Sequence, residues 1–448
     1  MPNPSCTNYR IEYAVKSDVG MRRANNQDAV LALADTDQTE GRGSLFIVAD
    51  GMGAHAAGEL ASELAVKNVP HEYKMLRDQP APAALRQAVQ KANGLIHAKG
   101  QSSSEFQGMG TTCASLVVLG DAALIAHVGD SRVYRIRELE LEQLTFDHSL
   151  VWELAEASHT TEDKIPACIP KNVITRSLGP HPVVNVDLEG PFDLKPGDVY
   201  LLCSDGLTGV VGDELIGGVL TAMAPEEAAQ TLVDLANLRG GPDNISVIVV
   251  RVGESDQPAG DDDPEQPTAH ACRGAAAYRT DPVRWLAMAA TAVCLAVVIW
   301  CIREQQTWGA VAAAIGLGGA AVRALGRSGH PRQAASFETL GGPYGSAPYR
   351  NCDCHSGERI TQHLRDVVDE LSRIRSGDSP RTKSTNGAEK IDWSSFDARC
   401  EQAAGCGDWR ETVSHYGAAI RNLMSQVRET PEAANAAIGA PSRNSAIG

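Results

Sequence analysis

Four aspartates in this chain of 448 residues share a local pattern that suits metal chemistry. Each stands at one end of an apolar run and beside a glycine or an asparagine: Asp50, Asp130, Asp205 and Asp243. A short apolar run predicts a buried strand, and a flanking glycine lets the chain turn sharply. For any one of these positions, a strand-end turn is a sufficient explanation. Their recurrence indicates instead that several strands deliver carboxylates to a common point.

A cluster of carboxylates in a protein interior requires a counter-charge, and divalent metal ions are the simplest source of it. Arg23 and Asp28 add an arginine and a further acid ahead of another predicted strand. Carboxylate oxygens suit Mg²⁺ or Mn²⁺. The residues therefore predict a site for two divalent ions, built from segments that are far apart in the chain.

Taken in order, these segments resemble the metal-dependent serine/threonine protein phosphatases, the PPM or type 2C family, in their bacterial form. The resemblance covers roughly residues 9–252 and rests on an ordered set of motifs: Arg23 to Asp28, Asp50-Gly51-Met52-Gly53 with His55 and Gly58-Glu59, Gly110-Thr111-Thr112, Gly129-Asp130-Ser131-Arg132, Ser204-Asp205-Gly206-Leu207 and Asp243-Asn244. It implies an α+β fold, a four-layer α/β/β/α sandwich of two antiparallel sheets with the metals in a channel at one edge. It also implies hydrolysis of phosphoserine and phosphothreonine in proteins, which reverses serine/threonine kinase signalling.

The metal ligands of the family carry over to this sequence by motif match. Asp50 is expected to bridge two Mg²⁺ or Mn²⁺ ions, and the Gly51 carbonyl is expected to reach one of them. Asp205 and Asp243 are expected to complete the ligands of the other ion. Two ions ~3.5–4 Å apart can hold one water and orient it for in-line attack.

Three further positions follow from the same resemblance. Asp28 is expected to hold metal-bound water, and Asp130 to support a third, weaker ion found in bacterial relatives. Arg23 matches the phosphate-binding arginine, whose guanidinium fork fits a phosphate dianion. The alternative for Arg23 is a surface cation, because Arg22 is adjacent. Arg23 and Asp50 are therefore the predicted catalytic residues.

Some positions depart from the family pattern or support it less directly. Met52 occupies the place where many eukaryotic relatives have a histidine proposed to protonate the leaving group, so the general acid is unassigned. Ala54 stands where bacterial relatives usually have glycine, and the neighbouring His55 is interpreted as structural. Arg132 is expected in a structural ion pair, and Asn244 is expected to orient its own loop.

Composition limits the partners and the compartment. The net charge of −16 argues against a nucleic-acid partner. Eleven cysteines are scattered singly and do not resemble a disulfide framework, which favours a reducing compartment. The first residues carry no basic run followed by an apolar one, so no N-terminal signal peptide is predicted.

Apolar periodicity predicts the elements that must position the acids. Strands are expected at residues 9–15, 28–34, 44–50, 113–119, 122–128, 132–136, 198–204 and 245–252. Helices are expected at 54–77 with an interruption at Pro70, and at 82–99, 151–157, 212–222 and 225–239. Together they make residues 1–253 the phosphatase domain, in which residues 146–179 correspond to the family's flap beside the active site.

The next two segments change character. Residues 254–281 are acidic and rich in proline, which predicts a solvated linker. Residues 282–325 are predicted to cross a membrane, because 285–302 carry no charge and 308–322 are rich in small residues that suit a packed hairpin. A buried helix of a soluble domain is the alternative, and one pass rather than two also remains open. Flanking arginines favour the cell membrane with a cytoplasmic catalytic domain.

The remaining chain is predicted to form a helical tail. Residues 326–390 are interpreted as a linker with one amphipathic helix at 358–376. Residues 391–430 resemble one tetratricopeptide-like helical hairpin, which is incomplete or docks elsewhere because a lone unit cannot bury its apolar face. Residues 431–448 are predicted to be disordered. These helices are a candidate site for a protein partner.

Phosphorylated proteins, among them a membrane-bound serine/threonine kinase, are the expected partners of the catalytic domain. A different class of function stays open: a membrane-tethered pseudophosphatase or scaffold that binds phosphorylated proteins without hydrolysis. Cys352, Cys354 and His355 form a weak zinc pattern, because four ligands are usual.

Overall fold

The computed structural model describes residues 9–34, 41–53, 56–166, 168–170, 172–254, 340–376 and 392–429. All of these residues belong to one compact unit. The predicted linker 254–281, the predicted membrane segment 282–325 and the predicted disordered tail 431–448 lie outside the described residues, apart from Glu254.

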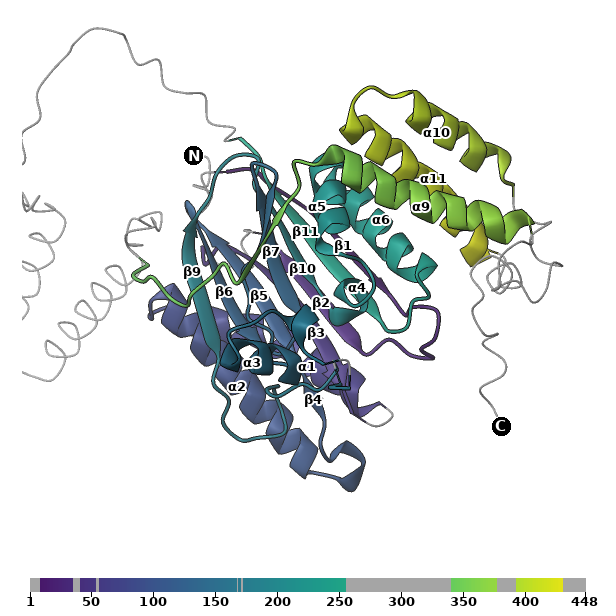
Figure 1. Cartoon of the computed structure of the whole chain (residues 1–448). Coiled ribbons are helices and arrows are strands. Elements are labelled where there is room, and N and C mark those ends of the chain that lie inside the picture. The colour runs from purple at the N-terminus through teal and green to yellow at the C-terminus, as the bar shows by residue number, and fades with distance from the viewer. Residues whose placement is uncertain are drawn as a thin grey trace, which may run out of the picture. The chain divides into compact units, whose positions relative to one another are not determined.

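Two antiparallel sheets form the centre of the unit (Figure 1). The first has the order β2 (Asp28–Leu33), β3 (Ser44–Met52), β5 (Cys113–Leu119), β6 (Ala122–Val128), β9 (Asp187–Asp193), with β4 (Gly110–Thr111) paired to β3. The second has the order β1 (Ile11–Asp18), β11 (Ile245–Val252), β10 (Val199–Cys203), β7 (Arg132–Arg137), β8 (Glu140–Gln143), β12 (Arg350–Asp353). Every strand pair is antiparallel, as the sequence predicted.

Helices cover the outer face of each sheet, which gives the predicted α/β/β/α layers. The first sheet packs against α1 (Ala57–Met75) and α2 (Ala81–Gln101), and the second against α5 (Asp213–Ala222) and α6 (Pro225–Leu238). Side chains such as Phe46, Leu116 and Tyr200 fill the space between the sheets and are fully buried. The short helices are η1 (Ser104–Phe106), α3 (Leu150–Ala157), η2 (Glu162–Lys164) and α4 (Asp205–Thr208).

The predicted interruption at Pro70 is wrong, because α1 runs through this residue without a break. A proline inside a helix removes one backbone hydrogen bond and crowds the preceding turn. Here Val69 and Tyr73 on either side are buried against the first sheet. The burial of this apolar face outweighs the local preference of proline.

The interpretation of residues 326–390 as a linker with one helix is incomplete. Residues 350–353 form β12, which pairs with β8 at the edge of the second sheet. Upstream, Tyr344 exchanges two backbone hydrogen bonds with Gly190. The sequence did not reveal this strand, because four residues that include Asn351 and Asp353 show no strand pattern. An open sheet edge can nevertheless pair with such a segment.

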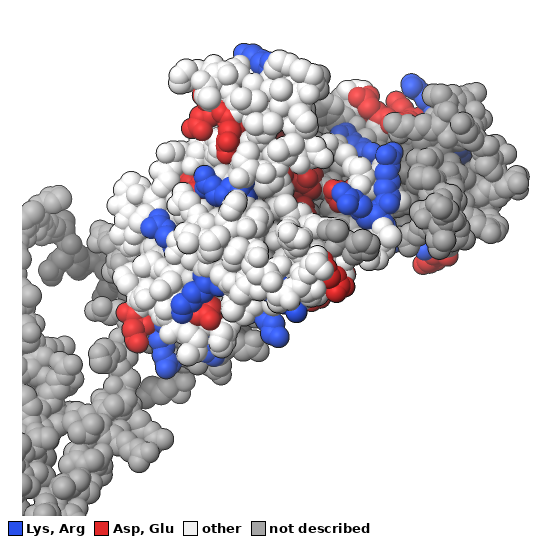
Figure 2. Space-filling view, turned by 90° about the horizontal axis from the view of Figure 1, so that it is seen from below, with Lys and Arg blue, Asp and Glu red and all other residues white. Residues whose placement is uncertain are grey.

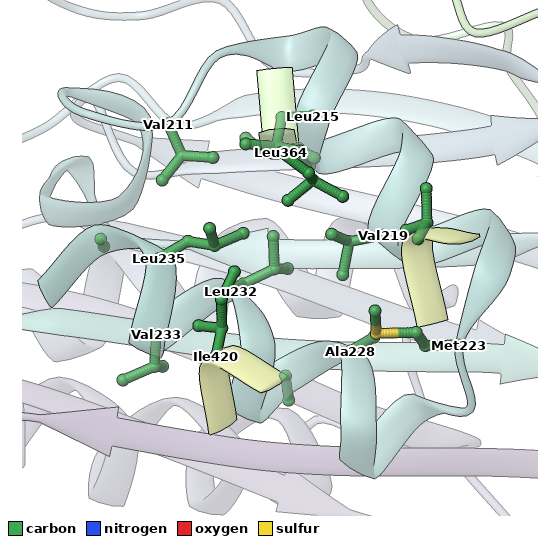
Figure 3. Packing of buried hydrophobic residues seen from close by; sticks show 14 of the residues in the cluster. Val211, Leu215, Val219, Met223, Ala228, Leu232, Val233, Leu235, Leu364 and Ile420 are labelled. Carbon is green, nitrogen blue, oxygen red and sulfur yellow. The ribbon is translucent and has the colours of Figure 1, made fainter. Parts of the chain in front are cut away.

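The C-terminal helices form a further layer over α5 and α6. They are α9 (Gly357–Ser376), α10 (Ser394–Gly405) and α11 (Trp409–Glu429), close to the predicted boundaries. Figure 3 shows Leu364 of α9 and Ile420 of α11 among the apolar side chains of α5 and α6. Both side chains are fully buried. The apolar stripes of the tail are therefore covered by the phosphatase domain itself.

On the face in Figure 2, acidic and basic side chains are interspersed among uncharged ones. Within the residues that the structure describes, no helix has the length and apolar character needed to cross a bilayer.

Candidate metal centre and phosphate site

The predicted acids converge at one end of the two sheets. Asp28 on β2 and Asp50 on β3 are direct cross-strand partners. Asp205 begins α4 immediately after β10, and Asp243 precedes β11. Asp130 lies in the turn between β6 and β7. The carboxylates of Asp28, Asp130, Asp205 and Asp243 are all close enough to Asp50 to act on its charge.

The backbone around Asp50 is fixed from the neighbouring strand. Thr112 Oγ1 accepts a hydrogen bond from the Asp50 amide at 2.8 Å, and Thr111 Oγ1 donates to the Asp50 carbonyl at 2.9 Å. Thr112 Oγ1 also lies 2.7 Å from Ser131 Oγ, next to Asp130. These hydroxyls therefore hold the β3 end and the Asp130 turn in one arrangement.

Close backbone contacts require glycine at the two Asp-Gly turns. A Cβ on Gly51 would overlap the Gly58 carbonyl oxygen, and a Cβ on Gly206 would overlap the Asn244 carbonyl oxygen. The Gly51 amide donates to the Gln27 carbonyl at 3.1 Å, which ties β3 to the segment before β2. The glycines therefore let the acid-bearing segments approach one another, besides forming turns.

Burial and mutual repulsion act together on the carboxyl groups. Burial, together with the charge of the nearby Asp205, raises the pKa of Asp28 to about 7 and the pKa of Asp130 to about 8. Burial and then the charges of Asp28 and Asp205 raise the pKa of Asp50 well above its usual range. Burial and Asp243 also raise the pKa of Asp205. The cluster is thus unfavourable as a set of anions unless protons or cations compensate it.

The donor set fits divalent ions. One carboxylate oxygen, Oδ1, is buried without a hydrogen-bond partner in each of Asp28, Asp130 and Asp205. A buried oxygen without a partner is unusual, and it is suited to bind a cation. Within the described residues, the side chains as they stand form no group of three or more acids, histidines or cysteines that could hold a metal ion. The five acids offer oxygen ligands, which Mg²⁺ and Mn²⁺ prefer.

Arg23 lies at the border of this cluster. Its Nη2 donates to Asp243 Oδ2 at 2.7 Å, and its side chain is 49% exposed. The guanidinium is therefore aimed by Asp243 and still accessible from solvent. Asn244 has a larger role than the sequence indicated: its side chain accepts from the Gln27 amide and donates to the carbonyls of Val19 and Asn25. It holds the whole Arg23 segment against β11.

Arg132 forms the predicted structural ion pair. It is buried, and its Nε and Nη2 donate to both carboxylate oxygens of Asp147 at 2.7–3.0 Å. His148, which follows Asp147 in the chain, accepts a hydrogen bond from the Gly129 amide at its Nδ1. Its Nε2 lies 2.8 Å from Asp187 Oδ2. The sequence pointed to Phe146-Asp147-His148-Ser149 only as the start of the flap, and no spacing signal revealed these partners.

The remaining sequence predictions have mixed outcomes. Ala54 and His55 lie outside the described residues. Met52 is the cross-strand partner of Gly110. The weak zinc pattern does not form a site in the described residues, because the His355 ring lies 2.6 Å from Asp353 Oδ1 and Cys354 is buried.

Comparisons with known proteins agree with this geometry. A family model described as protein phosphatase 2C matches residues 21–235. A putative protein phosphatase 2C-type from Streptococcus pyogenes is 37% identical over 249 residues, which cover 54% of this chain and 97% of that protein. The protein phosphatase PhpP of Streptococcus pneumoniae is 38% identical over 250 residues, or 55% of this chain and 99% of PhpP.

A longer relative and a solved structure extend the comparison. The serine/threonine protein phosphatase PstP of Mycobacterium tuberculosis is 37% identical over 252 residues, which cover 55% of this chain and 46% of PstP. A crystal structure of the PstP catalytic domain in complex with two manganese ions is also similar. The two chains are 36% identical, the match covers 55% of this chain and 99% of the PstP domain, and the TM-score is 0.47. The match covers nearly the full length of the two streptococcal relatives. The chain therefore belongs to the protein phosphatase 2C family of metal-dependent serine/threonine protein phosphatases.

Proposed function

We propose that the five converging aspartates hold the divalent ions of this serine/threonine phosphatase. Asp50 and the Gly51 carbonyl, with Asp205 and Asp243, would hold two ions; Asp28 would orient water, and Asp130 would hold a third ion. The observation that carries this proposal is the buried carboxylate oxygen without a partner on each of three acids. Like charges at such close range require cations if they are to stay ionised.

The ions, when bound, supply a water activated for attack and neutralise charge on the phosphoryl group. The chain's own residues do the positioning. Thr111 and Thr112 hold the backbone of Asp50 through hydrogen bonds, so the position from which its carboxylate extends is fixed. Arg23 is half exposed and would bind phosphate oxygens with its free N–H groups while Asp243 keeps it aimed.

Hydrolysis of p-nitrophenyl phosphate and of a phosphothreonine peptide with and without Mn²⁺ tests the metal assignment. Asp205→Asn should lower kcat at least about 100-fold, since even partners of metal ligands contribute 10- to 100-fold. It should also weaken the rise in melting temperature that Mn²⁺ causes in the wild type. Asp193→Asn is the matched control, because Asp193 forms an exposed ion pair with Arg137. Full activity of Asp205→Asn in EDTA would refute the assignment.

We further propose that residues 282–325 tether the chain to the cell membrane with an even number of crossings. Support for the tether comes from the uncharged run 285–302, and the connectivity of the described part limits the number of crossings. β11 ends at Val252, and from residue 340 the chain again belongs to the same compact unit. Two segments that pack together must lie on the same side of a bilayer, so the chain between them crosses it twice or not at all. Flanking arginines favour the cytoplasmic side.

Thiol labelling in intact bacterial cells tests this topology. An impermeant maleimide should leave both Cys168 of the phosphatase domain and Cys406 of the tail unlabelled, and should label both after permeabilisation. Labelling of Cys406 alone in intact cells would require a single crossing and would refute the proposal. Deletion of residues 282–325 should move the protein from the membrane fraction to the soluble fraction.

A tether of this kind favours phosphorylated proteins at the membrane as substrates, including a membrane-bound serine/threonine kinase. The tethered chain should dephosphorylate an autophosphorylated kinase in the same vesicles faster than the form without residues 282–325 does. Equal rates for the two forms would contradict the proposal that the tether favours substrates at the membrane.

A further inference from the structure

The segment that returns to the domain after residue 340 contacts the flap, residues 146–179. Its Tyr349 ring lies 5.6 Å from the Phe146 ring, in an edge-to-face arrangement. Arg350 Nη2 lies 2.8 Å from Glu162 Oε1, and the Arg350 guanidinium carbon lies 5.2 Å from the centre of the Trp152 ring. These contacts bring the C-terminal part of the chain to the flap.

The flap is attached to the acid cluster at both of its ends. At its start, Asp147 accepts hydrogen bonds from Arg132, two residues after Asp130. At its end, Leu178 exchanges two backbone hydrogen bonds with Thr111, whose hydroxyl bonds to the Asp50 carbonyl. The two ends of the flap are therefore anchored beside the acid cluster, and the residues between them depend on other contacts.

Glu162 connects Arg350 with Arg132. Its Oε2 lies 3.8 Å from Arg132 Nη2, while its other oxygen binds Arg350. Both guanidinium groups lie close to the Trp152 ring, with the Arg132 carbon 5.5 Å and the Arg350 carbon 5.2 Å from its centre. Burial alone would raise the pKa of Glu162, but the hydrogen bond from Arg350 and the two positive charges lower it. Glu162 is thus held as an anion between two cations from different parts of the chain.

We propose that Arg350 is a positioning residue for substrate binding, which holds the flap beside the metal centre through Glu162 and Trp152. The metal ligands come from residues before 254, whereas this support comes from beyond residue 340. The docked C-terminal segment thereby adds a support to the middle of the flap, at Trp152 and Glu162. A peptide substrate must pass the flap, whereas a small aryl phosphate needs little contact with it.

Steady-state kinetics of the full chain test this proposal, which rests on the phosphatase activity. Arg350→Ala should raise KM for a phosphothreonine peptide about 5-fold, with little change in kcat. A change of this size corresponds to the loss of one partly exposed hydrogen bond between charged groups. KM for p-nitrophenyl phosphate should stay near the wild-type value. Arg350→Lys should restore part of the peptide KM, because it keeps the charge near Glu162 but loses the planar stacking.

Arg359→Ala is the matched control. Arg359 also joins the tail to the domain, through Glu214 at 3.2 Å, but it makes no contact with the flap among the described residues. Hydrogen exchange of residues 150–164 supplies a readout that does not depend on turnover. It should become faster in Arg350→Ala and stay unchanged in Arg359→Ala.

The outcomes separate this proposal from the metal assignment. If Arg350→Ala changes the peptide KM and the exchange of residues 150–164 no more than Arg359→Ala does, the positioning role is refuted while the phosphatase stands. Additive effects of Arg350→Ala and Glu162→Ala on KM would equally refute the connection through Glu162. If the wild type itself fails to hydrolyse phosphate esters, both proposals fall.

Discussion

The acid cluster and the interface between tail and domain are built from distant segments, but they have opposite energetics. In the cluster, Asp28, Asp130 and Asp205 each have a buried oxygen without a partner, and all three add like charge around Asp50. In the interface, Leu364 and Ile420 bury apolar side chains against α5 and α6. The first arrangement opposes folding of the metal-free chain, and the second favours it.

The charged groups of the two regions differ in the same way. In the interface, charges are paired: Arg421 lies 3.0 Å from Glu227, and Arg428 binds the buried carboxylate of Asp234. In the cluster, the one ion pair among the described residues joins Arg23 to Asp243. A binding site for cations must leave negative charge uncompensated, whereas a structural interface gains by compensating it. The interface between tail and domain therefore contributes stability, whereas the acid cluster serves function at a cost in stability.

The largest expected effect comes from removing one charge of the cluster. Asp50→Asn should lower kcat at least about 100-fold, the upper range for partners of metal ligands. Because it removes a buried like charge, it should also raise the melting temperature of the metal-free protein. Activity assays with Mn²⁺ and thermal melts in EDTA measure the two effects. A lower melting temperature in EDTA would contradict the view that the cluster opposes folding.

Truncation in the interface should have the opposite sign. Ile420 is fully buried, so Ile420→Ala should lower the free energy of unfolding by about 2–5 kcal/mol. Urea unfolding of the full chain measures this change. Glu411→Ala on the same helix is the control, since Glu411 is exposed and should change stability by less than about 0.5 kcal/mol. Equal midpoints for both variants would mean that α11 adds no stability.

One group in the interface should make stability depend on pH. Burial raises the pKa of Asp234 to about 6 from 3.8, although Arg428 lowers it. A carboxyl with a raised folded pKa binds its proton more tightly when folded, so the free energy of unfolding falls as pH rises from about 4 to 6. Asp234→Asn should remove about 2–3 kcal/mol of this fall.

Unfolding curves at several pH values between 4 and 7 measure the slope. Asp397→Asn, which removes a carboxylate from the exposed pair with Arg375, is the matched control. Parallel pH profiles for the wild type and Asp234→Asn would show that Asp234 titrates normally in the folded chain.

The smallest effect is expected at the rim of the tail. Arg375 and Asp397 lie 2.8 Å apart, and both side chains are about half exposed. Exposed ion pairs contribute little, so Arg375→Ala should change the free energy of unfolding by less than about 1 kcal/mol. The same urea series tests it at low and high salt. A loss as large as that of Ile420→Ala would mean that charge, rather than apolar burial, holds the tail.

The helical tail marks the limit of prediction from sequence. The stripe of Ile360, Leu364 and Leu371 predicted an amphipathic helix, and α9 confirms it. That stripe did not reveal its partner, because an apolar face is compatible with any apolar surface. β12 and the Arg350 contacts were missed for a related reason: they depend on an edge strand and a flap that lie about two hundred residues earlier in the chain.

The sequence by itself determined the acids, the strands that carry them and the family, because each motif is local: an apolar run, a carboxylate and a glycine at the turn. Tertiary structure alone decided that α1 continues through Pro70, that Asn244 holds the Arg23 segment, and that the tail covers α5 and α6. Those features arise from burial and pairing between segments distant in sequence, and local preferences do not encode which segments will meet.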